Sequence, residues 1–298
     1  MKPTRQILSL VMCCLLSLLV WADGGELYTS GKLSSSLINC IAQDKYGYIW
    51  VGTEYGLSKF DGYRFTNYLH DEKDTTTITD NIITDILVDK KGDLWIGCAK
   101  GVMRYNYERN DFKRYHLPDG RKPRIYSMIE NHRGDILLGT AGYGLYSIKN
   151  GKRTVTPERQ YAERDSDVFF THIYEDQHRY LWQSSHLSTF ARFIEKNGRV
   201  LRKDFKSPCG APVSFIQHRP NAMLIVCMYG ILYYDYTTGR IADAGYDFGE
   251  FKNNVTINNA TFDHEGNLYI STSEHGALFI KKGTNRLVQL ENNNRYFN

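Results

Sequence analysis

Residues 44–53 read Asp44-Lys-Tyr-Gly-Tyr-Ile-Trp50-Val-Gly52-Thr53, and the pattern returns at residues 89–98 as Asp89-Lys-Lys-Gly-Asp-Leu-Trp95-Ile-Gly97-Cys98. Fainter copies follow along the rest of the chain. A period of about 42 to 45 residues, rich in aromatic residues and short apolar runs, is typical of a β-propeller. The pattern predicts an all-β chain of six recognisable four-stranded blades, which form either a complete ring or an incomplete seven-bladed one. The six copies begin at Asp44, Asp89, Asn131, Asp176, near Arg219-Pro220-Asn221, and at Asp263.

Each copy is expected to contribute four short strands. In the first copy we expect them at 37–42, 48–53, 57–61 and 64–69. The Asp-x-x-Gly stretch joins the first two strands, because Asp can bond the backbone ahead of it and Gly supplies the positive φ of a tight turn. The tryptophans Trp50, Trp95 and Trp182 share one repeat position, which favours packing between blades over stacking on a sugar. The repeats are expected at about 37–69, 82–115, 124–156, 168–205, 213–247 and 256–290.

The N-terminal residues have the features of a secretory signal. Lys2 and Arg5 precede an apolar stretch at 7–20, and Val20-Trp21-Ala22 supplies small or medium residues before Asp23. We therefore expect a signal peptide at 1–22, a propeller sensor domain at 23–298 and a periplasmic protein. The alternative is an uncleaved anchor in the inner membrane, although the apolar stretch is short for a full span. The net charge of +4 includes no basic cluster, so we expect no nucleic acid partner.

Four cysteines follow the signal segment, at Cys40, Cys98, Cys209 and Cys227. An even number in an oxidising compartment would ordinarily favour disulfides. Cys98 and Cys227, however, fall at the same repeat position of blades that are not adjacent, so we expect buried free thiols. No pair has the C-x-x-C spacing of a zinc or redox site, and each Asp turn offers too few oxygens for calcium. We expect neither a metal nor a cofactor.

Propeller geometry predicts where a ligand would bind. Because strand direction alternates within a blade, the loops between the second and third strands share a face with the loops that join consecutive blades. Tyr, His and paired charges on such a face would suit a sugar, whose apolar faces stack on rings while its hydroxyls bond charged groups. The ligand-binding candidates are Glu54, Tyr55, Lys100, Tyr143, His186, Tyr229, Glu274 and His275 from the first set of loops, with Arg121 and Arg124, and also Lys122, Asp71, Glu72 and Asp74, from the second set.

Catalysis has little support in the sequence. It contains no G-x-S-x-G elbow, no H-E-x-x-H motif and no Gly-rich phosphate loop after a strand. We therefore expect no catalytic residue. Two alternatives stay open. One is a propeller lyase of the streptogramin lyase kind, which would use a His base such as His186 or His275. The other is a scaffold for protein contacts, because many propellers have no small-molecule site.

The stretch from Ile41 to Asp61, Ile-x-x-Asp-x-x-Gly-x-Ile-Trp-Val-Gly-Thr-x-x-Gly-Leu-x-x-Phe-Asp, resembles the two-component regulator propeller repeat. The resemblance implies the periplasmic sensor part of a hybrid two-component sensor kinase, a class that often controls the use of complex carbohydrates. It implies a non-catalytic propeller that senses a small molecule or an oligosaccharide, such as a fragment of a glycan. It also implies signalling through self-association or contact with a membrane sensor kinase.

Full-length proteins of this kind resemble histidine kinases, and the kinase portion does not fit within 298 residues. We therefore expect a truncated or partial histidine kinase gene product, with a ring that is open or closes imperfectly. Glu26 to Ser30 is expected to form an outermost strand, and Arg286 to Leu290 is expected to form the outer strand of the sixth blade. An open ring would expose strand edges, which is an aggregation hazard.

Overall fold

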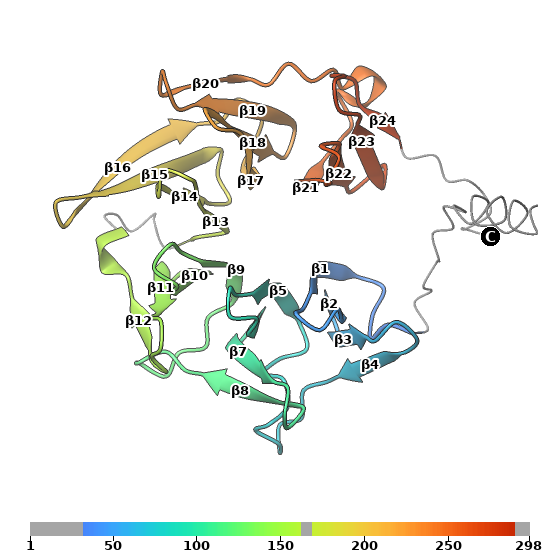
Figure 1. The fold of residues 1–298 in the computed structure, drawn as a ribbon, viewed down its shortest axis with the longest axis vertical. Coiled ribbons are helices and arrows are strands. Elements are labelled where there is room, and N and C mark those ends of the chain that lie inside the picture. Colours follow the sequence, from blue (N-terminus) through green and yellow to red (C-terminus); the bar gives the residue numbers. More distant parts are fainter. Residues whose placement is uncertain (1–31, 162–168, 290–298) are drawn as a thin grey trace, which may run out of the picture. The chain divides into compact units, whose positions relative to one another are not determined.

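The computed structural model describes residues 32–161 and 169–289. The expected signal peptide at 1–22, the expected strand from Glu26 to Ser30 and the last residue of the expected outer strand, Leu290, lie outside the described residues. Within them the chain forms six four-stranded antiparallel sheets, which we call blades 1 to 6. The expected all-β propeller with six four-stranded blades is confirmed (Figure 1).

The strands of blade 1 begin and end within one residue of the bounds expected for the first copy, and blades 2 and 3 repeat their order. Blade 1 holds β1 (Ile38–Gln43), β2 (Ile49–Thr53), β3 (Gly56–Phe60) and β4 (Phe65–Tyr68). Blade 2 holds β5 (Ile83–Val88), β6 (Leu94–Cys98), β7 (Gly101–Asn106) and β8 (Asp111–Tyr115). Blade 3 holds β9 (Ile125–Glu130), β10 (Ile136–Thr140), β11 (Leu145–Ile148) and β12 (Val155–Pro157).

Blades 4 to 6 repeat the same order of strands. Blade 4 holds β13 (His172–Glu175), β14 (Leu181–Ser184), β15 (Thr189–Lys196) and β16 (Arg199–Lys206). Blade 5 holds β17 (Pro212–Arg219), β18 (Ala222–Cys227), β19 (Gly230–Asp235) and β20 (Arg240–Asp243). Blade 6 holds β21 (Ile257–Phe262), β22 (Leu268–Thr272), β23 (Ala277–Ile280) and β24 (Val288–Gln289). Two short 3₁₀ turns, η1 (Arg159–Tyr161) and η3 (Gly249–Phe251), follow blades 3 and 5, and no helix among the described residues could cross a membrane.

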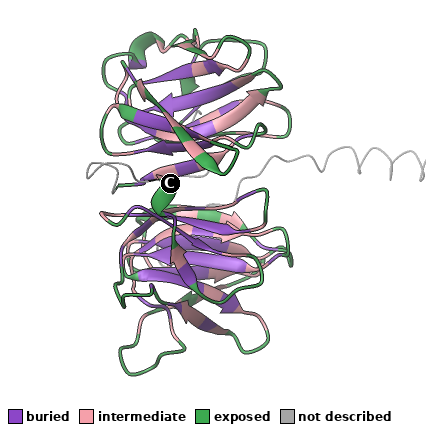
Figure 2. Ribbon diagram, turned by 90° about the vertical axis from the view of Figure 1, so that its left-hand side faces the viewer, coloured by how far each residue is buried: buried purple, intermediate pink, exposed green. Residues whose placement is uncertain are grey.

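The first strand of each blade is the innermost, and these strands contact one another in the order β1, β5, β9, β13, β17, β21 (Figure 1). The apolar core is divided accordingly. Five clusters of buried side chains occur in the described residues, and each lies between two consecutive blades. Buried residues follow the strands while exposed residues collect in turns and loops (Figure 2). The repeat therefore works as a stacking unit, because no blade buries its faces alone.

The recurring Asp is a hydrogen-bond centre at the start of each turn. In blade 1 the Oδ1 of Asp44 accepts hydrogen bonds from the backbone N–H groups of Tyr46 and Tyr48, at 2.9 and 3.1 Å. Its Oδ2 accepts one from the ring N–H of Trp50 at 2.8 Å and one from the hydroxyl of Tyr107, in blade 2, at 3.0 Å. Blade 4 repeats this geometry, with Asp176 in the place of Asp44. The expected structural role of the turn is confirmed, and the Asp also links two blades.

The glycine in the second strand leaves a recess that the next blade fills. A Cβ on Gly52 would lie 2.6 Å from the side chain of Ile83, and one on Gly97 would lie 3.0 Å from that of Ile125. Both distances are shorter than ordinary carbon contacts, so an alanine would collide with the first strand of the following blade. The Trp-x-Gly spacing thus sets how closely consecutive blades approach.

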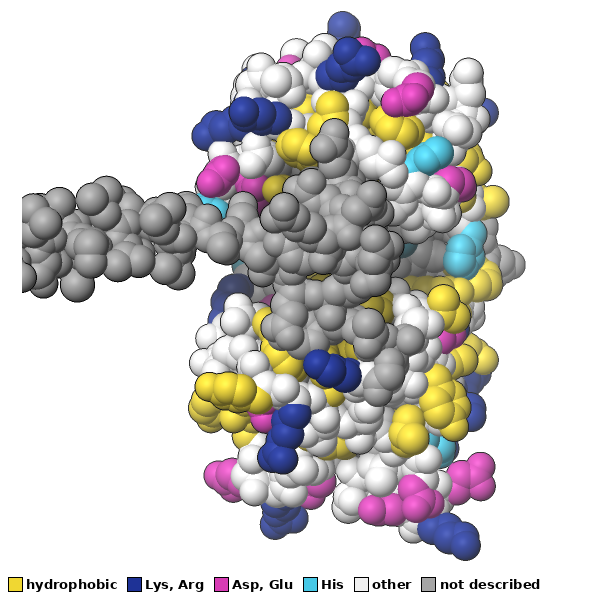
Figure 3. All heavy atoms as spheres, turned by 90° about the vertical axis from the view of Figure 1, so that its right-hand side faces the viewer, with side chains coloured by type: hydrophobic (Ala, Val, Ile, Leu, Met, Phe, Trp, Pro, Cys, Tyr) yellow, Lys and Arg dark blue, Asp and Glu magenta, His cyan; other side chains and the backbone are white. Residues whose placement is uncertain are grey.

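The inner strand of blade 1 has no such partner in the described residues. Ile41 is 68% exposed, whereas its counterparts Ile86 and Met128 are 8% and 4% exposed. Ile38 is 54% exposed, whereas its counterpart Ile83 is fully buried. Figure 3 views the molecule from the side on which β1–β4 and β21–β24 lie in Figure 1, and it shows hydrophobic side chains at the surface. The described residues therefore leave an apolar face of blade 1 uncovered.

Candidate functional site

The loops between the second and third strands and the loops between blades lie at one end of the blades, which we call the loop face. The Asp turns and the turns between the third and fourth strands lie at the other end, the turn face. These positions follow from the antiparallel order of strands within each blade. The sequence-predicted ligand residues all belong to the loop face.

Four of those residues, from blades 3 and 4, lie in one group on the loop face. The guanidinium of Arg121 lies 5.0 Å from the ring centre of Tyr143. The guanidinium of Arg124 lies 5.6 Å from the ring centre of Tyr126, whose edge meets the ring of His186 at 5.3 Å. Stacking of a cation on an aromatic face is favourable and orients both groups.

Three further residues complete this group and were not predicted from the sequence as ligand residues. Phe169 is 38% exposed and its ring lies 5.5 Å from that of His186. Tyr126 connects Arg124 to His186. His172 interacts electrostatically with His186, and its Nδ1 lies 3.4 Å from the Oγ of Ser184. We call Arg121, Arg124, Tyr126, Tyr143, Phe169, His172 and His186 the loop-face cluster.

Backbone geometry fixes the arrangement of the loop-face cluster. The amide of Ala141 donates to the carbonyl of Arg124 at 3.0 Å, which holds the loop of Tyr143 against the strand that carries Tyr126. A Cβ on Gly142 would lie 3.9 Å from the ring of Phe169, so this loop also reaches blade 4. The cluster therefore spans two blades that are joined by a packed core.

The electrostatics of the cluster favour a ligand with acceptor oxygens. The Nε of Arg124 is buried and has no hydrogen-bond partner among the described residues. A buried unpaired donor costs free energy, and an acceptor from a ligand would remove that cost. Burial, together with the charge of His186, lowers the pKa of His172 to about 4, so this imidazole is neutral near pH 7.

The other predicted ligand residues have local partners or lie alone. Glu54 accepts a hydrogen bond from Asn39 at 2.9 Å, and Lys100 pairs with Asp80 at 2.9 Å. Tyr55 and Tyr229 are 56% and 57% exposed on blades 1 and 5. On blade 6, the carboxylate of Glu274 accepts from the amide of Thr256, and the Nε2 of His275 lies 3.0 Å from the carbonyl oxygen of Asn254. Asp71 and Asp74 accept hydrogen bonds within their own loop, from the amides of Lys73 and Thr76.

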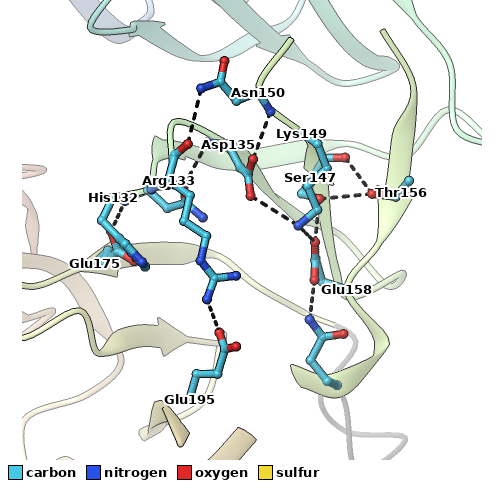
Figure 4. A network of polar contacts seen from close by, with 12 residues as sticks. His132, Arg133, Asp135, Ser147, Lys149, Asn150, Thr156, Glu158, Glu175 and Glu195 are labelled. Atoms are coloured by element: carbon cyan, nitrogen blue, oxygen red, sulfur yellow. Dashed lines mark hydrogen bonds and ion pairs between the residues drawn. The ribbon is translucent and has the colours of Figure 1, made fainter. Parts of the chain in front are cut away.

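A cavity of about 370 Å³ lies at the turn face between blades 3 and 4. Lys149, Arg133 and His132 each contact carboxylates at this cavity (Figure 4). Lys149 lies 3.3 Å from Asp135 and 2.5 Å from Glu158. Burial opposes ionisation of Glu158, yet its hydrogen bonds from Lys149 and Ser147 outweigh burial and hold its pKa below the ordinary value. One ammonium group thus bridges two carboxylates in this part of the network.

Two ion pairs of the same network cross between the blades. His132 in blade 3 lies 2.7 Å from Glu175 in blade 4, and Arg133 lies 2.5 Å from Glu195 (Figure 4). Their partners are therefore supplied by the protein itself. The network is best explained as a connection between blades rather than a ligand site.

A second cavity, of about 790 Å³, lies at the turn face between blades 5 and 6. The rings of His218 and Phe262 stack in it at 5.3 Å, with an angle of 17° between their planes. No Asp or Glu among the described residues lines this cavity, in contrast to the cavity between blades 3 and 4. Its basic lining residues are His218, Arg219, Lys281 and Lys282.

Comparison with known proteins agrees with this architecture. The two component regulator propeller family matches residues 32–55 and 77–100. A histidine kinase P4 of Formosa agariphila is 49% identical over 47 residues, which are 16% of this chain and 3% of the kinase. The chain is therefore a β-propeller, and two segments in its first two repeats match the two component regulator propeller family.

Two solved structures show the same fold. The extracellular domain of a putative hybrid two component system from B. thetaiotaomicron has a TM-score of 0.74 at 18% identity, over 86% of this chain and 35% of that one. A catalytically inactive variant of virginiamycin B lyase from Staphylococcus aureus, with quinupristin, has a TM-score of 0.68 at 17% identity, over 89% of this chain and 87% of the lyase. The chain therefore spans about a third of the first protein's extracellular domain.

Proposed function

We propose that this protein is a non-catalytic propeller that senses a glycan-derived ligand as the input part of a hybrid two-component system. The matched repeats and the fold shared with an extracellular sensor domain support the sensing role. The sequence features of residues 1–22 support export to the periplasm. Signalling would follow from altered contacts with a second copy or with a membrane sensor kinase.

The observation that carries the ligand class is the loop-face cluster. It presents aromatic rings from two blades, the guanidinium of Arg121, which also pairs with Asp119 at 3.1 Å, and that of Arg124, whose buried Nε has no partner among the described residues. Rings stack on the apolar faces of a sugar, and guanidinium groups bond its oxygens. The charged network at the turn face lacks such free donors, because its charges are paired with one another.

Calorimetric titration of the purified chain against a panel of neutral and acidic oligosaccharides tests the proposal. We expect saturable binding by at least one glycan and unchanged glycan on recovery. Arg124→Ala and His186→Ala should each weaken binding about tenfold or more, because a charge-assisted hydrogen bond or a ring contact contributes about 1.5 kcal/mol. Lys100→Ala is the matched control, since Lys100 lies on the same face but pairs with Asp80.

Each other outcome of the titration identifies a different function. Conversion of a glycan, or of quinupristin added as a further titrant, would overturn the non-catalytic role and favour the lyase alternative. Loss of binding in Arg219→Ala, with Arg124→Ala unaffected, would move the ligand to the cavity between blades 5 and 6. Absence of heat with every glycan would favour a scaffold for protein contacts. Export is tested separately, by sequencing the N-terminus of the chain recovered from the periplasm.

A further inference from the structure

The segment before blade 5 brings two cysteines together. Cys209 precedes β17 and is partly buried, whereas Cys227 ends β18 and is fully buried. The amide of Tyr229 donates to the carbonyl of Cys209 at 3.0 Å, and the amide of Met228 donates to that of Ala211 at 3.0 Å. The segment at 209–211 therefore runs beside the end of β18, which sets the backbones of the two cysteines side by side.

A single hydroxyl contacts both sulfur atoms. The Oγ of Ser207 lies 3.5 Å from the Sγ of Cys209 and 3.3 Å from the Sγ of Cys227. The same oxygen accepts a hydrogen bond from the amide of Cys209 at 3.2 Å, which fixes this residue toward β18. Both cysteines belong to the apolar cluster between blades 4 and 5, so the two thiols are confined to one small volume.

We propose that Cys209 and Cys227, free thiols in this structure, form a disulfide when the protein meets a disulfide donor. The donor is an oxidised dithiol or oxidised glutathione, of the kind that exported proteins encounter. In the cell the reaction therefore rests on the proposed export, but the chemistry of the pair does not depend on the ligand. The bond would fasten the segment at 207–211 to the loop of Tyr229 on the loop face.

The reaction begins at Cys209, because its sulfur is the more accessible one. The hydrogen bond from the thiol of Cys227 stabilises the thiolate and lowers the pKa of Cys209 to about 7, whereas the pKa of Cys227 is raised. The thiolate of Cys209 attacks one sulfur of the donor disulfide and releases the other as a thiolate. The sulfur of Cys227 then loses its proton and attacks Cys209, releasing the second donor sulfur. Two thiols lose two electrons and two protons, and the donor disulfide gains both.

The test uses the full chain, reduced and folded, in buffers of increasing oxidised glutathione. The remaining thiols are then alkylated after unfolding and counted by mass spectrometry. We expect two fewer alkylated cysteines than in the reduced protein. Cyanogen bromide cleaves after Met223, between the two cysteines, so the fragments that hold Cys209 and Cys227 should stay joined until a reductant is added.

Two variants locate the bond. In Cys209→Ser, all remaining thiols should stay alkylatable. Cys98→Ser is the matched control, because Cys98 holds the repeat position of Cys227 but has no second cysteine beside it. This variant should lose two alkylatable thiols on oxidation, as the parent protein does. Oxidation should raise the thermal midpoint of the parent protein by roughly 5–10 °C, because a closed loop of this length constrains the unfolded chain. The midpoint of Cys209→Ser should not respond to oxidation.

The proposal is overturned by any of three results. The first is full alkylation of both cysteines at every glutathione ratio. The second is a stable glutathione adduct on Cys209, which would show that Cys227 does not reach it. The third is a disulfide between two copies of the chain, seen as a dimer on a non-reducing gel.

Discussion

Asp176 receives hydrogen bonds from its own turn, from its own blade and from the next blade. Its Oδ2 accepts from the ring N–H of Trp182 at 2.7 Å and from the hydroxyl of Tyr236 at 2.9 Å. Its Oδ1 accepts from two backbone amides of the turn, and the residue is 4% exposed. A recurring acidic residue in these repeats therefore marks the junction between blades.

Asp176→Ala is expected to destabilise the protein by about 3 kcal/mol, because several buried donors lose their acceptor at once. Asp263→Ala is the matched control. Asp263 holds the same repeat position in blade 6, but it bonds the amide and side chain of Asn267 instead of a tryptophan ring, and its loss should cost less. The free energy of unfolding in urea measures both. Equal losses in the two variants would contradict the role of the ring and hydroxyl donors.

His172 is expected to make stability depend on pH. Its pKa is about 4 in the folded protein, where burial and His186 disfavour the charge, and about 6.5 when unfolded. Protonation thus favours the unfolded chain, so this contribution is present in full above pH 6.5 and is lost as pH falls toward 4, by at most about 3 kcal/mol. Asp85 makes stability depend on pH in the opposite direction. Burial raises its pKa to about 6, so its contribution to stability is lost as pH rises.

The share of His172 is measured by comparing the parent protein with His172→Asn in urea at pH 4, 5, 6 and 7. The difference in unfolding free energy between the two should shrink as pH falls below 6.5. His116→Gln is the control, because His116 is exposed on blade 2 and lies outside the loop-face cluster. If the unfolding free energies of the parent and of His172→Asn changed in parallel with pH, His172 would not be the cause of the pH dependence.

At the scale of the strand, the same position has opposite environments in different blades. The third residue before each Asp turn is buried in β5 and β9, where the preceding blade covers it, and exposed in β1. The side chain of Ile41 is therefore chemically identical to that of Ile86 but makes no equivalent contact. Substituting Ile41 and Ile86 in turn therefore separates the contribution of the side chain itself to stability from that of its packing against the preceding blade.

Ile86→Ala should cost about 2 to 4 kcal/mol, because it leaves a cavity between blades 1 and 2. Ile41→Ala should cost less than about 1 kcal/mol, because its side chain already faces solvent. Chemical unfolding of both variants under one set of conditions gives the comparison. A loss in Ile41→Ala as large as that in Ile86→Ala would show that the inner face of blade 1 is covered in solution.

The fold could be predicted from the sequence because the repeat fixes strand, turn and packing positions together. The order Asp, Gly, Trp, Gly placed β2 to within one residue. The grouping of Arg121, Arg124, Tyr143 and His186 could not be predicted, because it depends on which loops of adjacent blades approach each other. Phe169 was missed because it lies in the few residues before β13 and was not assigned to either set of loops.

The cysteine pair shows a signal that sequence reasoning could have used. The expectation from the sequence is buried free thiols; all four cysteines in the described residues are free, but only Cys98 and Cys227 are buried, whereas Cys40 and Cys209 are partly exposed. That expectation compared Cys98 with Cys227 at equal repeat positions. Counting residues outward from the hairpin at 219–222 places Ser214 near Cys227 and so brings the segment before β17, which holds Cys209, beside the end of β18. Two register shifts, which the sequence does not show, place Pro212 rather than Ser214 opposite Cys227.

At the scale of the whole molecule, the blades form a series in which each contacts its neighbours. Blades 3 and 4 have packed clusters on both sides, and ion pairs of the charged network join them to each other. Among the described residues, blade 1 has an apolar cluster on one side alone, shared with blade 2, and blade 6 shares one with blade 5. Stability in such an array is a sum over interfaces, so it should fall toward the ends of the series.

Native-state hydrogen exchange should reveal this gradient. Amides in β2 and β22 are expected to exchange faster than those in β10 and β14, at least tenfold for each 1.4 kcal/mol of lost interface energy. Mass spectrometry of peptides from each blade, under conditions where exchange reports opening free energies, measures it. Equal protection in all six blades would instead indicate a ring that opens as one cooperative unit.

The uncovered row on β1 offers a site for engineering an additional blade. Ile38 projects from β1 as Ile125 projects from β9, where Gly97 makes room for it. A designed four-stranded sheet, appended in front of β1 and carrying glycine and tryptophan at the Gly97 and Trp95 positions, would receive Ile38 and Ile41 in the same way. The natural glycine spacing thus supplies a joining rule by which propellers of chosen length can be assembled from these repeats.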